Sequence, residues 1–437
     1  MPANSDQIEP RSPARASTRG LSVTSLALLS GLGVFGASSF ILLGLAGREL
    51  GPAGSAPLSV AWTAVNAVGI GLFMPVEQEV SRLTAARRAT VSLAPTLTHV
   101  TRYVLWALAV TSALTLFLSQ PLANLLFSGE ITIVRLTAVA LAAVGLEYYV
   151  RGSLSGSGLF VRYGTQLMID GGARIVIALA VFLGPWDSAA AYGVALVVSP
   201  AVATLLTVSI PVLGWMRKSP TKAHASSIAP LVLTSLSSQL LANAGPLAIA
   251  ALSTSAQEAD TGRFVAAVTV GRIPLFLFAA IQAVFLPTLA GLVTRADIEG
   301  FRRTFRKAWT ATAAIGLLGT AGVAFLGQWV IRVIYGPDFD VNLLDLLLIA
   351  LSGSLFMASQ VLAQALLAHR QDTLVLVGWT VGLLVTGASL ALPIPLTTRV
   401  ATALVAGAAA SSLVMVMAYA QTMTAWARNM TPETRKS

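Results

Sequence analysis

The sequence contains no cysteine and has little charge. None of the 437 residues is Cys, and 11% are Asp, Glu, Lys or Arg, against roughly 25% in soluble domains. The missing thiols exclude disulfides, thiol catalysis and thiolate metal sites. A chain so poor in charge cannot cover its surface for water, so its solvent must be lipid.

Other chemical signatures are also absent. No Gly-Lys pair occurs, which excludes a Walker-type phosphate loop. His99, His224 and His369 lie far apart and predict no metal site. Residues 31–36 match the dinucleotide fingerprint, but they lie in an apolar run, where close helix packing is the better interpretation. We therefore expect neither an enzyme nor a cofactor, and no nucleic-acid partner.

Long apolar runs fill most of the chain. Hydrophobic residues make up 55% of it, and the mean hydropathy is +0.78. A hydrocarbon core about 30 Å thick needs ~20 apolar residues per helix. No strict alternation appears, which favours helices over a barrel. The pattern predicts an all-α polytopic membrane protein of twelve transmembrane helices, over residues 23–46, 55–77, 103–127, 132–150, 165–184, 190–213, 229–252, 263–287, 308–334, 342–367, 374–395 and 400–426.

Short sequence echoes predict that the chain is duplicated. Phe73-Met74-Pro75 returns as Phe285-Leu286-Pro287, and the segment 117–120 (FLSQ) returns as 325–328 (FLGQ). A duplicated chain has two six-helix bundles, with a substrate path between them. The expected parts are a disordered cytoplasmic tail (1–20), a first bundle (21–213), a cytoplasmic linker (214–228), a second bundle (229–427) and a cytoplasmic tail (428–437).

Positive charge predicts the orientation. Lys and Arg gather in the tails and in alternate loops. Because cytoplasmic loops carry this excess, both termini should be cytoplasmic in a cell membrane. Five arginines are expected at the opposite boundary (Arg48, Arg135, Arg263, Arg332 and Arg399), and two within spans (Arg174 and Arg272).

The charges inside spans are the candidate functional residues. Asp170 and Arg174 lie four apart on one helix face, in the order that favours pairing. A charge at mid-bilayer costs roughly 2.5–3.5 kcal/mol, so Arg174 should meet a partner or a polar interior. Two interpretations remain open: a cationic lining for an anionic head group, with Asp170 tuning it or carrying a coupling ion, and a neutralised pair that locks the helix.

Five further charged residues have alternative roles. Arg272 is unpaired in the eighth span and predicts a cavity role, whereas Arg48 suits a boundary anchor or a ligand contact. Glu147 is expected to anchor the end of the fourth span together with Arg151, or to act in ion coupling. Glu77 and Glu79 are expected to pair with Arg82 in a local salt-bridge cluster, or to form an inner gate.

Neutral polar side chains also occur within the apolar runs. Such groups hydrogen-bond neighbouring helices, at about 0.6 kcal/mol each, or they bind sugar hydroxyls. The candidates for substrate binding are Asn243 in the seventh span and Gln282 in the eighth.

Several segments resemble the polysaccharide-exporter flippases of the multidrug/oligosaccharidyl-lipid/polysaccharide exporter (MOP) superfamily. The similar segments are 47–52 (GRELGP), 72–82 (LFMPVEQEVSR), 151–156 (RGSLSG), 243–246 (NAGP) and 272–274 (RIP). The resemblance implies a V of two six-helix bundles that moves polyprenyl-pyrophosphate-linked oligosaccharide from the inner to the outer leaflet. It also implies that cationic residues such as Arg48 and Arg272 meet the pyrophosphate. The extra two helices common in lipid II flippases are absent.

Three functions remain open from the sequence. The first is the flippase, whose partners would be a lipid-linked glycan, membrane lipid, and glycosyltransferases or a polymerase of a polysaccharide pathway. The second is a cation-coupled multidrug antiporter of the same superfamily, for which Asp170 is the one deep acidic candidate. The third is a membrane scaffold in cell-wall assembly that transports nothing.

Overall fold

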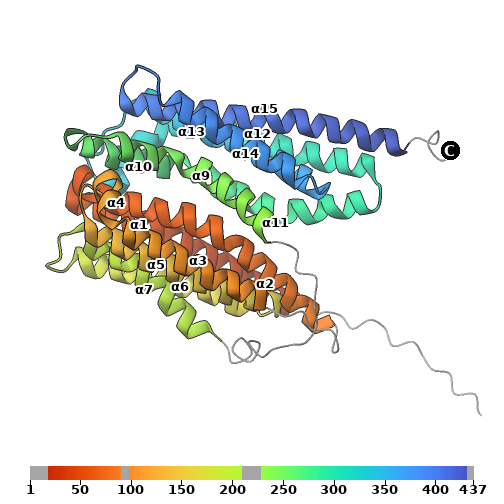
Figure 1. Ribbon diagram of the computed structural model, residues 1–437, viewed down its shortest axis with the longest axis horizontal. Coiled ribbons are helices and arrows are strands. Elements are labelled where there is room, and N and C mark those ends of the chain that lie inside the picture. The colour runs from red at the N-terminus through yellow and green to blue at the C-terminus, as the bar shows by residue number, and fades with distance from the viewer. Residues whose placement is uncertain (1–17, 90–97, 209–227, 431–437) are drawn as a thin grey trace, which may run out of the picture.

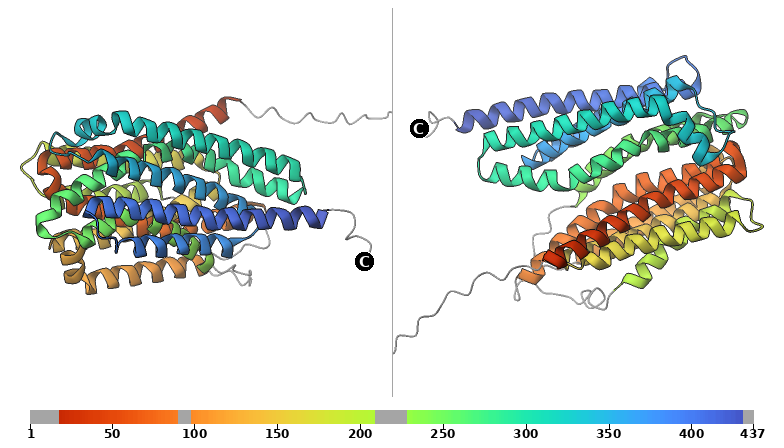
Figure 2. Two further views of the ribbon diagram at one scale, coloured as in Figure 1. Left: turned by 90° about the horizontal axis from the view of Figure 1, so that it is seen from above. Right: turned by 180° about the vertical axis from the view of Figure 1, so that it is seen from behind.

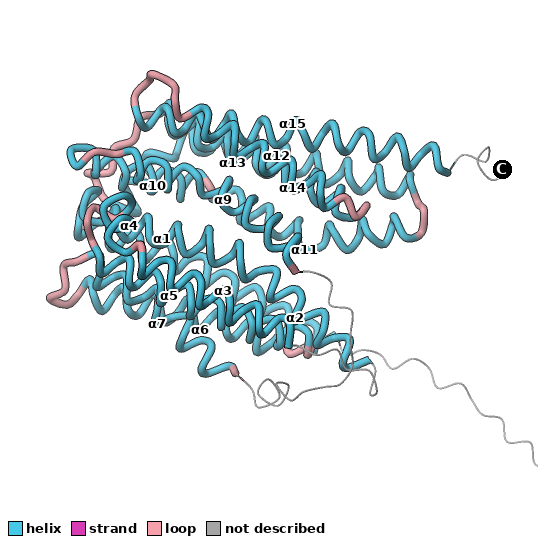
Figure 3. Tube along the Cα trace, viewed as in Figure 1, coloured by secondary structure: helices cyan, strands magenta, loops and turns pink. Residues whose placement is uncertain are grey.

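The computed structural model describes residues 18–89, 98–208 and 228–430, and these residues form helices without a strand among them (Figures 1 and 3). Nine of the described helices are long and apolar enough to cross a membrane, and the first folds over to cross twice. With α9 and the broken pair α10–α11 they make twelve crossings. The predicted all-α polytopic fold with two six-helix bundles is confirmed. Nearly all of the predicted linker and tails lies outside the described residues.

The first bundle runs from α1 to α7. Its elements are α1 (Thr18–Ala64), a π-helical segment (Val65–Ile70), α2 (Gly71–Ala89), α3 (Thr98–Phe117), α4 (Ser119–Leu126), α5 (Ile131–Gly156), α6 (Phe160–Phe182) and α7 (Ala189–Thr207).

The second bundle runs from α9 to α15. Its elements are α9 (Ala229–Leu252), a 3₁₀ turn (Ser255–Gln257), α10 (Glu258–Gly271), α11 (Ile273–Thr294), α12 (Ile298–Tyr335), α13 (Leu343–Ala368), α14 (Asp372–Ser389) and α15 (Leu396–Met430).

The predicted loop between the first two spans is a kink. Gly51 has φ 69° and ψ −178°, and the chain is helical on both sides of it. Pro52 follows, and its missing N–H removes a helical hydrogen bond at the point where the helix bends. The predicted break between the first two spans is therefore present, but a glycine kink makes it, without an intervening loop.

The start of α12 differs from the start of the predicted span. α12 begins at Ile298 rather than at residue 308, because Asp297 caps it by accepting a hydrogen bond from Gly300 N at 2.8 Å.

The matched repeat positions Phe117 and Phe325 are both 86% exposed. Both therefore lie on the outer surface of their bundles, as a duplicated architecture requires.

The two bundles form a V. Their helices meet at the end that carries α4 and α10, and spread apart toward the end where the described chain begins and ends (Figures 1 and 2). We call these the converging end and the diverging end. Of the loops rich in Lys and Arg, the described one between α11 and α12 lies at the diverging end, where α12 and α15 also extend furthest (Figure 1).

Apolar packing explains this shape. At the converging end one core holds residues of both bundles, including Leu42 and Leu43 of α1, Phe264 of α10 and Ile331 of α12. Toward the diverging end the cores are separate: one around Phe73 in the first bundle, and two others in the second. The core that both bundles share therefore lies at the converging end, while further along α2 and the π-helical segment pack against α9.

Small residues allow the close contact between the bundles. A side chain added at Gly262 of α10 would lie 1.9 Å from the carbonyl oxygen of Pro52, and one added at Gly47 would lie 2.9 Å from the ring of Tyr335. Lipid tails are as apolar as leucine, so such close packing holds membrane helices together. Gly31 packs in the same way against Gly164, as expected for the fingerprint-like segment.

Candidate functional site

Asp170 and Arg174 form a buried ion pair on α6. Arg174 donates from Nη2 to both carboxylate oxygens of Asp170, at 3.0 and 3.2 Å, and from Nη1 to Ser38 Oγ of α1 at 3.1 Å. The Arg174 and Asp170 side chains are 9% and 1% exposed. The predicted pairing is confirmed, and it gives Arg174 a partner inside the first bundle.

A second buried ion pair lies on α5. Arg151 donates from Nη2 to Glu147 Oε1 at 2.5 Å, and its guanidinium lies 4.9 Å from the ring centre of Tyr148. Both charged side chains are buried. The pair lies inside the bundle, and α5 continues past it to Gly156; its role as an anchor at the membrane boundary stays a prediction.

Glu77 of α2 joins these pairs through α6. Its Oε1 accepts a hydrogen bond from the hydroxyl of Tyr163 at 3.0 Å. The expected pairing with Arg82 is confirmed for Glu79 but not for Glu77. Arg82 donates to both carboxylate oxygens of Glu79, at 2.8 and 2.6 Å, because residue 79 lies three positions from it on the same helix face.

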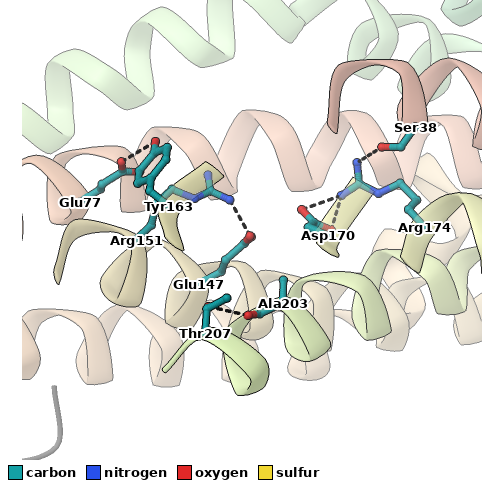
Figure 4. A network of polar contacts seen from close by, with 9 residues as sticks. All are labelled: Ser38, Glu77, Glu147, Arg151, Tyr163, Asp170, Arg174, Ala203 and Thr207. Atoms are coloured by element: carbon teal, nitrogen blue, oxygen red, sulfur yellow. Dashed lines mark hydrogen bonds and ion pairs between the residues drawn. The ribbon is translucent and has the colours of Figure 1, made fainter. Parts of the chain in front are cut away.

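The two ion pairs share one aromatic ring. The guanidinium groups of Arg151 and Arg174 lie 5.8 and 5.1 Å from the ring centre of Phe35 on α1. Glu147 also interacts electrostatically with Asp170 and Arg174. Figure 4 shows the pairs side by side between α1, α5, α6 and α7. We call Glu77, Glu147, Arg151, Asp170 and Arg174 the acid–arginine cluster.

The acid–arginine cluster has one more acid than base. With all five side chains ionised it carries one net negative charge, which is costly in a membrane interior. The described residues include no group of three or more His, Cys, Asp or Glu that could hold a metal ion. A proton on one carboxyl is the simplest species that balances the charge.

Buried polar atoms near the acid–arginine cluster are left without partners. Both amide atoms of Gln166, one turn before Asp170 on α6, are buried and make no hydrogen bond, and the same is true of Ser199 Oγ on α7. Orphaned buried groups are rare in proteins and call for a ligand, a water or a conformational change. The interior of the first bundle is thus suited to exchange protons or water.

The second bundle contains a contrasting site at Arg272. This residue stands between α10 and α11, where the eighth crossing breaks, and Pro274 follows at the start of α11. Arg272 donates from Nη1 to Asn243 Oδ1 of α9 at 2.9 Å. None of the ion pairs in the described part of the chain includes it.

A small cavity adjoins Arg272. It has a volume of about 30 Å³ and is lined by α9, α10, α11, α13 and α15. That volume holds one or two waters. The amino end of α11 adds a positive helix dipole at the same point. Arg272 and Asn243, both predicted as substrate-binding residues, thus meet at a site suited to an anion.

The remaining predicted site residues lie elsewhere. Arg48 donates to the carbonyl oxygens of Ile334 (3.0 Å) and Val333 at the end of α12, so it joins the two bundles at the converging end. Gln282 lies in α11, and its side chain is outside the described part.

Sequence reasoning gave too little weight to Arg151 and missed Tyr163 and Phe35. The four-residue spacing of Glu147 and Arg151 is the same signal that identified Asp170 and Arg174, and it could have revealed the second pair. The contacts of Tyr163 with Glu77 and of Phe35 with two arginines join separate helices, so no local pattern reports them.

The fold is that of the MATE transporters of the MOP superfamily. An inward-facing structure of a multidrug resistance MATE family transporter of that superfamily matches with a TM-score of 0.67 and 14% identity, over 92% of this chain and 100% of the other. An outward-facing structure described in the same way matches with a TM-score of 0.63 and 14% identity, over 93% and 96%. A variant of the Vibrio cholerae MATE transporter VcmN matches with a TM-score of 0.65 and 16% identity, over 94% of this chain and 99% of the other.

Sequence relatives occur among mycobacteria. An uncharacterized protein of Mycobacterium bovis is 27% identical over 401 residues, which cover 88% of this chain and 89% of that protein. An uncharacterized protein of Mycobacterium tuberculosis is 28% identical over 404 residues, covering 87% and 88%. The chain matches no protein-family model. Fold and apolar helices together define a multi-pass membrane protein with the MATE architecture.

Proposed function

We propose that this protein is a flippase of the cytoplasmic membrane, which moves polyprenyl-pyrophosphate-linked oligosaccharide toward the outer leaflet by alternating access. In this proposal the diverging end faces the cytoplasm, as the Lys and Arg distribution predicts. The higher TM-score with the inward-facing than with the outward-facing transporter, 0.67 against 0.63, agrees with bundles that spread at that end.

Arg272 is the observation that carries the proposal. Its guanidinium has no carboxylate partner in the described part of the chain, whereas Arg151 and Arg174 are each neutralised within one turn. α10 places it roughly 21 Å from the converging end, at 1.5 Å per residue. An unpaired cation near mid-membrane favours an anionic substrate, and guanidinium binds phosphate through paired hydrogen bonds.

The acid–arginine cluster supplies the energy coupling in this mechanism. A proton that neutralises the extra carboxylate would change the attraction between α2, α5 and α6. Such a change biases one conformation of the bundle only if the two conformations hold the proton with different affinity. Asp170, Glu147 and Glu77 are therefore proposed as coupling residues, with Arg174 and Arg151 as their fixed counter-charges.

The test is transport of a fluorescent polyprenyl-pyrophosphate oligosaccharide in proteoliposomes. Arg272→Ala should weaken substrate affinity about 10- to 100-fold, the value of one or two charge-assisted hydrogen bonds. Arg272→Lys should recover part of it, and the exposed Arg135→Ala serves as a control. Undiminished transport by Arg272→Ala, at a normal protein level, would overturn the role of Arg272. Absence of transport by the wild type would overturn the proposed flippase function.

A second candidate is a proton-coupled multidrug antiporter. The observation that favours it is the fold, since the matching structures include multidrug resistance transporters, and the acid–arginine cluster would serve coupling there too. A cationic drug, however, has no use for the unpaired Arg272. Proton-driven efflux of a lipophilic cation from the same proteoliposomes, without movement of the lipid-linked glycan, would establish this function instead. Glycosyltransferases or a polymerase remain proposed partners of the flippase alone.

A further inference from the structure

A polar pocket of about 310 Å³ lies at the converging end, between the two bundles. Its volume falls at the lower end of the range for small-ligand sites, roughly 300–1,000 Å³. One wall comes from α4 and the turn after it, and the other from the end of α9, the 3₁₀ turn and the start of α10. Its polar lining includes Asn124, Ser128, Ser253, Ser255, Glu258 and Thr261.

The lining residues restrict the ligand. They comprise hydroxyls, an amide and one carboxylate, with no Lys, Arg or His, so a phosphate group would find no counter-charge. One carboxylate is also too few for a metal ion, which prefers several oxygen ligands. Hydroxyls and amides both donate and accept, and a carboxylate accepts from two or more hydroxyls. Ala56 and Leu126 add an apolar surface for the C–H face of a sugar ring.

Glu258 is the strongest hydrogen-bond acceptor in this pocket. It stands in the first turn of α10, half-buried, and it takes part in none of the ion pairs found in the described residues. Thr261, one turn further along α10, is buried and donates to Ser253 Oγ at 3.1 Å. The pocket thus has a fixed polar floor and a free carboxylate at its edge.

The position of the pocket gives its occupant a mechanical effect. Its two walls belong to different bundles, so opening the converging end would pull them apart. A ligand that contacts both walls binds the closed form better and must stabilise it. Ala250, which lines the pocket, belongs to the apolar core that both bundles share.

We infer that this pocket at the converging end is a saccharide-binding site, and that a bound neutral sugar holds the converging end closed. The identification of the sugar with exported glycan rests on the proposed function. The expectation that the pocket binds a sugar rests only on the residues that line it. The site would let accumulated product slow further transport.

The first test measures sugar binding to the full chain in lipid nanodiscs by saturation-transfer NMR. The probes are neutral trisaccharides that end in glucose, galactose, rhamnose or N-acetylglucosamine. We expect at least one to bind, Glu258→Gln to weaken it tenfold or more, and Ser253→Trp to abolish it by filling the pocket. Glu130→Gln changes an exposed carboxylate that lies in the turn after α4 but does not line the pocket, so this variant should bind as the wild type does. If no probe binds to a protein that is shown to be folded by its cooperative unfolding, the proposed site is wrong. It is also wrong if all variants bind the probes equally.

The second test measures closure. Because the chain has no cysteine, Asp187→Cys and Pro393→Cys place spin labels on one loop of each bundle without competing thiols. A bound probe should shift the distance distribution toward its shortest values, and an unchanged distribution with bound probe would refute the coupling. Arg272→Ala should keep sugar binding while its affinity for the transported substrate falls. Sugar binding without any wild-type transport would therefore defeat only the proposed function.

Discussion

Arg48 should hold the converging end closed, and its replacement by alanine should open that end. The guanidinium reaches from α1 to the last turn of α12, where it donates to the carbonyl oxygens of Ile334, at 3.0 Å, and of Val333. These carbonyls lie at the negative end of the α12 dipole. The contact joins the two bundles, so it exists only while they are together at this end.

The size of the effect follows from these two hydrogen bonds. A charged donor contributes about 1.5–3 kcal/mol to a buried bond, but Arg48 is exposed, and solvent reduces its contribution. We take about 2 kcal/mol for the pair of bonds. That is a ~30-fold change in an equilibrium constant, since ~1.4 kcal/mol is tenfold. An open form populated at about 1:99 would rise to roughly 1:3.

The assay is the distance between spin labels at Asp187→Cys and Pro393→Cys, measured with and without Arg48→Ala. The control is Arg332→Ala, which removes an exposed arginine from the same end of α12. Arg332 pairs with Asp340 of its own bundle at 3.0 Å, so its loss should leave the distances unchanged. An unaltered distribution in Arg48→Ala, or an equal shift in Arg332→Ala, would refute the reasoning.

Two further predictions concern stability. Arg151→Ala should lower the free energy of unfolding by about 3–5 kcal/mol, because Glu147 is left buried without its partner. Arg82→Ala, which breaks a pair whose arginine is 56% exposed, should cost under ~1 kcal/mol; thermal unfolding in detergent measures both, and equal losses would contradict the burial argument. Burial lowers the pKa of His369, in the loop after α13, below its usual value near 6.5. As the pH falls, His369 therefore takes up a proton in the unfolded chain before it does so in the folded chain, and stability should fall as pH drops below about 6.5. His369→Phe, which keeps ring contacts with Phe301 and Trp426, should remove this component of the pH dependence, and an unchanged pH profile would count against it.

Composition and local spacing were enough to predict the outline of the fold. The apolar runs predicted the twelve crossings, because in lipid each backbone must satisfy its hydrogen bonds within its own helix. The spacing of Asp170 and Arg174 predicted their ion pair, because residues four apart share a helix face. Arg272 was identified as an intramembrane charge, although not as the point where its helix breaks.

Contacts between helices were beyond the reach of sequence patterns. Arg48 has no partner near it in the chain, and its acceptors lie in the other bundle. Residues 47–52 have the composition of a turn, yet packing of α1 against α10 and α12 keeps them in a kinked helix.

The amino-acid sequence by itself determined that this chain lies in a membrane, how often it crosses, and which charges are expensive to bury there. These properties follow from transfer free energies and from neighbours within one helical turn. Only the tertiary structure decided which of these charges meet across helices. Arg151 of α5 and Arg174 of α6 share one phenyl ring of α1, whereas Arg272 meets Asn243 of α9 at a helix break. That difference depends on how separate helices pack, and no one helix contains it.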